Sequence, residues 1–225
     1  MEINADFEEP VLRHTSQIDW VASPMAGVER RMLDRIGGEV ARATSIVRYA
    51  KGSSFAEHTH SGGEEFIVLE GVFQDEHGDY PAGTYIRNPV GTHHIPRSDP
   101  GCTIFVKLWQ FDPADQEQIA VDLDSIEILP ALDRAGVSSA TLAAREYEHV
   151  ALEVWDAHAK VGLSDPCGLE MLILDGSCSH NDEIYGRHDW IRLPAGASET
   201  FVAESSGARV WIKRGHLANI VAPAK

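Results

Sequence analysis

Apolar and polar positions alternate along much of the chain with the two-residue period of β-strands. In residues 103–111, aliphatic side chains occupy every second position at Ile104, Val106 and Leu108. Successive side chains of a strand point to opposite faces, so this pattern predicts a strand. Residues 39–49 are rich in β-branched side chains, and residues 66–69 form a short apolar run typical of a buried strand. Glycine and proline separate these segments at intervals of roughly ten residues, which predicts a closed or sandwiched antiparallel all-β fold.

Two segments depart from this pattern. Residues 112–147 contain few strand signals, and we expect them to connect two domains, with a short helix over residues 137–145. The first 30 residues are expected to form a strand and an arm that packs on a barrel or on a partner chain, and a homodimer is one expected assembly.

The second half of the chain repeats the first at an offset of 105 residues. Residues 65–71 align with residues 170–176, and residues 85–91 align with residues 190–196, at the same offset and without gaps. Such a repeat predicts two copies of one barrel, each of about 100 residues. The predicted division is an N-terminal barrel at 1–112, a connection at 113–147 and a C-terminal barrel at 148–225.

Composition and charge narrow the classes of partner. The net charge of −16 argues against nucleic acid or an anionic membrane as the main partner. No apolar run is long enough to span a bilayer, and the first residues lack the basic and apolar regions of a secretory signal, which favours a cytoplasmic location. Cys102, Cys167 and Cys178 match no zinc or redox motif and are expected to be reduced thiols.

Four residues have the chemistry and the spacing of metal ligands. His58 and His60 lie two positions apart, so in a strand both point to one face and can meet on one ion. A turn at Ser61-Gly62-Gly63 allows Glu64 to return from the next strand, and His94 follows 30 residues after Glu64. This nitrogen and oxygen donor set suits Zn, Fe, Ni, Co or Mn.

The residues around these ligands resemble the two sequence motifs of the cupin family. The first motif is matched by Gly52, His58, His60, Glu64 and Gly71, and the second by Gly83, Pro89, Gly91 and His94. The resemblance implies two cupin-type barrels (double-stranded β-helix, or jelly-roll), with one divalent cation held by three imidazoles and one carboxylate. It also selects His94 over His93 and Glu64 over Glu65.

The second copy lacks this donor set. At the offset of the repeat, the four ligand positions become Leu163, Asp165, Leu169 and Glu199. Two aliphatic residues and no imidazole make a poor transition-metal site, so we expect one metal per chain, in the N-terminal barrel. Tyr85 and Arg87 lie on one strand face and are candidates to orient the ligands. Arg87 recurs as Arg192 in the metal-free copy, which favours a structural role for it.

Residues 58–89 resemble the cupin domain of the ChrR anti-sigma factors. In that family the cupin is a sensory domain that binds zinc and is needed for the response to singlet oxygen and organic hydroperoxides. The resemblance therefore implies zinc and a sensory or regulatory role, with a small-molecule ligand in the N-terminal barrel. The chain has no His-x3-Cys-x2-Cys segment, which argues against direct sigma-factor binding. The alternative is an Fe(II)-dependent cupin dioxygenase that acts on a small molecule such as a β-diketone.

Overall fold

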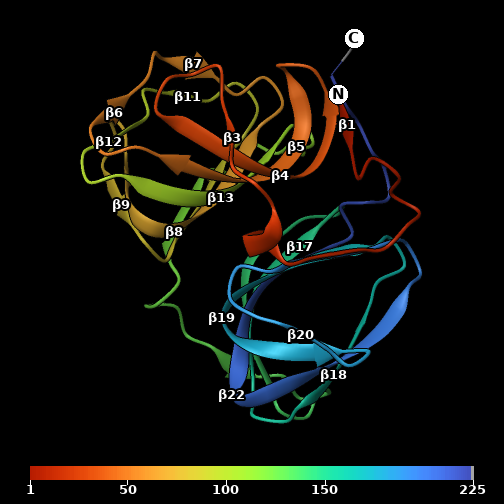
Figure 1. Ribbon diagram of the computed structural model, residues 1–225. Coiled ribbons are helices and arrows are strands. Elements are labelled where there is room, and N and C mark those ends of the chain that lie inside the picture. Colours follow the sequence, from red (N-terminus) through yellow and green to blue (C-terminus); the bar gives the residue numbers. More distant parts are fainter. Residues whose placement is uncertain (224–225) are drawn as a thin grey trace. The chain divides into compact units, whose positions relative to one another are not determined.

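Two compact β-structured units make up the chain. The computed structural model describes residues 1–223. The first unit comprises Met1–Ala5, Ile18–Ser125 and residues 221–223, and the second comprises Asp6–Gln17 and Ile126–Ile220 (Figure 1). Apart from the 3-10 turn η1 (Thr15–Gln17), the regular structure of the described residues is β-strand, so the all-β prediction is confirmed. Within that same part of the chain, no helix has the length and apolar character needed to cross a membrane.

The first unit is built on an antiparallel sheet of 11 strands. Its main path follows the order β1 (Glu2–Ile3), β4 (Val28–Gly37), β5 (Ala41–Tyr49), β13 (Cys102–Leu108), β8 (Glu64–Gln74), β10 (Thr84–Asn88) and β14 (Ile119–Asp122). The side strands are β3 (Val21–Ala22), β6 (Ser53–Ser54), β9 (Asp79–Pro81) and β12 (Arg97–Ser98), and a separate pair is formed by β7 (His58–Thr59) and β11 (His93–His94).

The second unit has a sheet of nine strands. Its main path follows the order β15 (Leu129–Pro130), β16 (Val137–Ala144), β17 (His149–Trp155), β22 (Ser198–Arg214), β19 (Leu169–His180), β21 (Trp190–Leu193) and β2 (Val11–Arg13), with β18 (Lys160–Ser164) and β20 (Glu183–Tyr185) at its sides. The N-terminal arm therefore adds strand β2 to β21 by antiparallel pairing.

The segment predicted to connect the barrels contributes strands to both sheets. Strand β14 pairs with β10 in the first unit, while β15 and β16 belong to the second, so the boundary lies at Ser125 and Ile126 rather than at residues 112 and 147. The helix expected over residues 137–145 is wrong. These residues form β16, which buries Val137, Ala140 and Leu142 and pairs along its length with β17.

Each unit encloses its own core. In the first unit, inward side chains of β5, β8 and β13 pack together, including Val47, Phe66, Val68, Ile104 and Val106. The core of the second unit is larger and includes the two leucines at former ligand positions, Leu163 and Leu169. The repeat is also visible in the register, because His58 pairs with His94 in one unit as Leu163 pairs with Glu199 in the other.

Buried polar side chains form an equivalent layer in both units. The Arg87 guanidinium is fully buried and donates to Glu65 and Asp115, at 2.7 Å each, and the Tyr85 hydroxyl donates to Glu65 at 2.8 Å. In the second unit, Glu170 faces Arg192 in the same register. Glu65 follows the candidate ligand Glu64 and therefore points to the opposite side of β8. Tyr85 and Arg87 thus hold Glu65 instead of orienting the candidate ligands, and these contacts give Arg87 the structural role that the repeat indicated.

Candidate metal centre

The four predicted ligands come from three neighbouring elements of the first barrel. His58 in β7 and His94 in β11 are direct cross-strand partners, and His60 follows β7. Glu64 is the first residue of β8 and is reached through the predicted turn at residues 61–63. Gly63 adopts a φ of 76°, a conformation that favours glycine, and a Cβ atom there would lie only 2.4 Å from the Phe111 ring.

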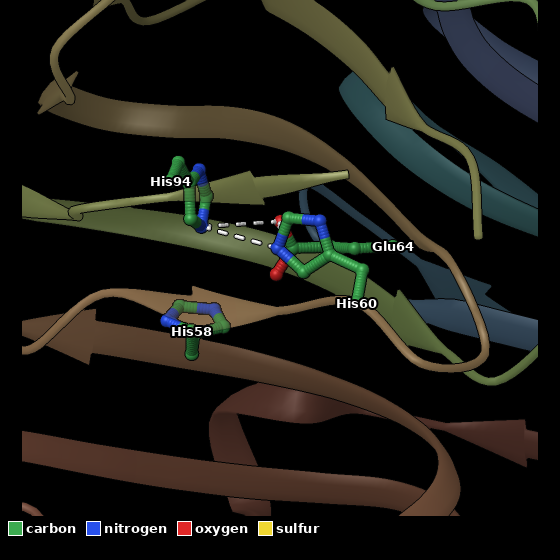
Figure 2. A group of neighbouring side chains, drawn as sticks. All are labelled: His58, His60, Glu64 and His94. Atoms are coloured by element: carbon green, nitrogen blue, oxygen red, sulfur yellow. Dashed lines mark hydrogen bonds and ion pairs between the residues drawn. The ribbon is translucent and has the colours of Figure 1, made fainter. Parts of the chain in front are cut away.

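These elements bring the four side chains together (Figure 2). One ligand atom from each of His58, His60, Glu64 and His94 lies within 4.8 Å of all the others. The Nε2 atoms of His60 and His94 are 3.3 Å apart, and a Glu64 carboxylate oxygen lies 3.3 Å and 3.7 Å from them, respectively. His60, Glu64 and His94 are buried, whereas His58 is exposed. His58 thus forms the accessible side of the cluster.

A hydroxyl group fixes the tautomer of His60. The Thr92 hydroxyl donates to the Pro89 carbonyl at 2.7 Å, so it has no proton left for His60. His60 Nδ1 lies 2.9 Å from that hydroxyl oxygen and must therefore be the donor of this hydrogen bond. The lone pair of a neutral His60 then lies on Nε2, which faces the cluster. Burial lowers the pKa of His60 and favours this neutral form.

The Asp75 carboxylate favours the corresponding tautomer of His94. Asp75 places an oxygen 3.4 Å from His94 Nδ1, while its other oxygen accepts from the backbone N–H groups of His77 and Gly78 at 2.8 Å and 3.2 Å. Burial alone would lower the pKa of His94, but Asp75 and Glu64 outweigh that effect and raise it. A proton held on Nδ1 by Asp75 again leaves the Nε2 lone pair for the cluster.

A cation can satisfy this arrangement. With Nδ1 of His60 held by Thr92 and Nδ1 of His94 held by Asp75, the neutral imidazoles direct their Nε2 lone pairs toward each other and toward the Glu64 carboxylate. Ligand atoms at about 2.0–2.1 Å from one ion would be roughly 3.3 Å apart in a tetrahedral set, which matches the spacing of His60, His94 and Glu64. The residues present therefore fit a divalent metal ion.

The Glu64 carboxylate is positioned by an amide. Asn88 Nδ2 donates to it at 3.3 Å, and Gln118 in turn donates to the Asn88 side-chain oxygen at 3.0 Å. Sequence reasoning missed Asn88, Thr92 and Asp75 as orienting residues. Their types are common in turns and carry no spacing signal of their own, so only the register of the folded chain reveals these contacts.

His93 stays outside the cluster, as the spacing predicted. Its side chain is 59% exposed and lies 3.6 Å from the carboxylate of Glu57, which is also exposed. Because adjacent strand residues face opposite ways, His93 points away when His94 points inward. In the second barrel, Leu163 and Leu169 are fully buried, so apolar packing fills two former ligand positions. Among the described residues, the cluster in the first barrel is the one group of this kind.

A cavity of about 420 Å³ adjoins the cluster within the first barrel. His58, His60 and Glu64 line it, whereas His94 does not. Its wall is mainly apolar and includes Val47, Phe55, Ile104, Val106, Leu108 and Trp109. Trp109 ends β13 because it adopts a φ of 62°, rare for a bulky residue, and its side chain packs over Gly62 beside the ligands. A small molecule in this cavity would reach the cluster from the side of His58.

Comparison with solved structures identifies the fold. A candidate dioxygenase from Nostoc punctiforme matches with a TM-score of 0.79 at 14% identity, over 97% of this chain and 87% of that one. A candidate glyoxylate-induced protein from Pseudomonas aeruginosa matches with a TM-score of 0.73 at 13% identity, over 97% and 93%. The bacterial pirin YhhW from Escherichia coli, solved in complex with nickel(II), matches with a TM-score of 0.61 at 13% identity, over 91% and 98%.

The fold and the cluster together define a protein with two cupin barrels, of which the first carries a candidate three-histidine, one-glutamate metal site. Residues 8–112 match the family described as the ChrR cupin-like domain. Among curated proteins, none matches the sequence.

Proposed function

We propose that the first barrel holds one divalent metal ion through His58, His60, Glu64 and His94, and that it serves as a small-molecule sensor. The converging acceptors of the cluster carry the metal part of this proposal. A bound ion would supply an electrophilic centre with room for a further donor from the cavity. Zinc is the proposed ion, since the ChrR-type cupin resemblance favours it over iron, nickel or manganese.

The cavity wall supports binding rather than chemical conversion. Besides the ligands, the ionisable side chains that line it are Arg30, Glu39 and Tyr49. Burial raises the pKa of Tyr49 far above its ordinary value, so its hydroxyl is a poor acid or base near neutral pH. The residues flanking the ligands in the lining, such as Thr59 and Ser61, offer no strong base. This wall can enclose a ligand and exclude water but has little means to move protons.

A dioxygenase is the second candidate. It is favoured by the cavity that opens onto three of the four ligands, and by the structural likeness to a candidate dioxygenase. In that case His58, His60, Glu64 and His94 would hold Fe(II), and the apolar wall would orient the substrate.

Metal analysis combined with an oxygen-uptake screen separates these functions. For the sensor, protein purified without added metal should contain close to one zinc per chain and should not consume oxygen over many turnovers with any substrate offered. Multiple turnovers with Fe(II) and a β-diketone, lost in His58→Ala, would establish the dioxygenase instead. Less than a tenth of a metal per chain, with no uptake on adding zinc, would contradict both.

A further inference from the structure

Arg30 introduces a positive charge into the apolar cavity of the first barrel. It lies on β4, two positions from Val28, and both residues line the cavity. Its cross-strand partner on β5 is Val47, another lining residue. The next residue, Arg31, faces the other way and stacks over the Trp20 ring at 4.4 Å. Strand alternation therefore directs Arg30 into the barrel and Arg31 away from it.

Arg30 has no protein partner within the part of the chain that the structure describes. No hydrogen bond or ion pair joins it to another residue there, and its Nε atom is buried without an acceptor. A guanidinium presents five donors, and burying one of them, here Nε, without an acceptor has a cost. An acceptor that enters the cavity would remove this cost.

The surrounding charges do not neutralise Arg30. Burial lowers the pKa of the nearby Arg35, and repulsion from Arg30 lowers it further. Besides Glu64, Glu39 is the one carboxylate in the lining. Its charge raises the pKa of Arg35, and the Arg35 guanidinium donates a hydrogen bond to the Glu39 backbone carbonyl at 3.2 Å. The field at Arg30 therefore favours an anion.

The sheet register sets the separation between Arg30 and the cluster. Arg30 pairs with Val47, Val47 with Ile104, and Ile104 with Val68 of β8. Glu64 lies four residues before Val68 on that strand, an offset of about 13 Å along the strand direction, and strands β5 and β13 lie between β4 and β8. The cavity volume of about 420 Å³ lies within the range typical of small-molecule sites. A ligand that reaches both ends must therefore be elongated, with an apolar body between them.

We propose that this cavity binds a small organic anion with an apolar body, whose carboxylate-type group pairs with Arg30 while the body lies against Val47, Ile104 and Val106. A second donor at the far end would face the cluster. That metal-directed end rests on the proposed function, whereas the Arg30 end does not.

Paired probes of equal shape and different charge test the inference. Octanoate and octanamide, and 4-butylbenzoate and 4-butylbenzamide, are titrated calorimetrically at pH 7.5 into metal-loaded and chelator-treated protein. Arg30→Met removes the charge and keeps an apolar stem. Arg31→Met is the matched control, because it removes the neighbouring charge from the outward face. Arg30→Lys keeps the charge without the planar fork, and thermal unfolding and metal content verify that each variant is folded.

We expect at least one carboxylate to bind at least tenfold more tightly than its amide to wild type and to Arg31→Met. In Arg30→Met that ratio should fall below two, and Arg30→Lys should retain part of it. Equal affinity for acid and amide in the wild type, a preference that survives in Arg30→Met, or no binding of either acid would overturn the inference. An Arg30-dependent preference in a protein that takes up no metal when metal is offered would contradict the proposed metal function and leave the anion site standing.

Discussion

Asp75 lies beside His94 and outside the four-residue cluster, so replacing it tests how the candidate site is held in place. Asp75→Asn keeps the size of the side chain and an oxygen that can accept from the backbone N–H groups of His77 and Gly78. The oxygen that faces His94 Nδ1 at 3.4 Å becomes an amide nitrogen, which donates instead of accepting. His94 is then driven to carry its proton on Nε2, where it cannot bind a metal.

The structure sets the size of the expected loss. Asp75 is 7% exposed, so water cannot readily take over its role. Removing such an orienting partner of a metal-bound histidine typically weakens metal affinity by about 10- to 100-fold, or about 1.4 to 2.7 kcal/mol. The loss should be smaller than in His94→Ala, which removes the ligand itself.

Competition with a chromophoric chelator for Zn²⁺ at pH 7.5 measures the affinity directly. Glu57→Gln is the matched control, because Glu57 faces the exposed His93 at 3.6 Å outside the cluster. Its zinc affinity should stay within twofold of wild type. If Asp75→Asn binds zinc within threefold of wild type while His94→Ala loses most of its zinc affinity, Asp75 does not orient His94 for metal binding.

Four further outcomes are expected. The chain should bind one metal ion by elemental analysis; a value near two would place a second site in the other barrel. His60→Ala should sharply lower metal content and melting temperature, since metal binds the folded state, whereas His93→Ala should change neither. The reverse result would show that the choice of His94 over His93 as a ligand is wrong. Hydrogen bonds that His14 donates to the carboxylates of Asp189 and Glu183 raise the pKa of His14, so their stabilising effect is complete below about pH 6.5 and lost as pH rises through the folded pKa. His14→Gln should therefore cost more unfolding free energy in urea at pH 5.5 than at pH 8.5, and an equal cost would contradict this sign. An isolated sigma factor should not be retained in a pull-down with or without zinc; a tight metal-dependent complex would show direct anti-sigma activity.

Strand periodicity and the internal repeat were enough to predict most of the fold. The run with aliphatic side chains at every second position forms β13, and the apolar run at residues 66–69 lies inside β8. The helix expected over residues 137–145 failed because alanine, serine and threonine are compatible with either structure locally. Pairing of β16 with β17, together with burial of Leu142, decides the outcome, and neither is visible in a short window of sequence.

The clustering of the four candidate ligands could be predicted from the sequence because these residues are close in sequence or fixed by motif spacing. The residues that orient them could not be predicted in this way. Thr92 reaches His60 across 32 positions, and Asn88 reaches Glu64 across 24 positions. These contacts depend on the register of β10 and β11 against their neighbours. The direction of Arg30 into the cavity likewise follows from strand pairing.

Comparison of the two barrels separates what the fold requires from what the site requires. Both keep a buried glutamate opposite a buried arginine, as Glu65 with Arg87 and Glu170 with Arg192. A single charge left in such a layer would be costly, so both partners are constrained by stability in each copy. The ligand positions differ, because the second barrel closes fully with buried Leu163 and Leu169 in place of His58 and Glu64. The second barrel thus closes without the four-residue cluster, which supports the proposal that the cluster in the first barrel serves to bind a cation rather than to hold the fold together.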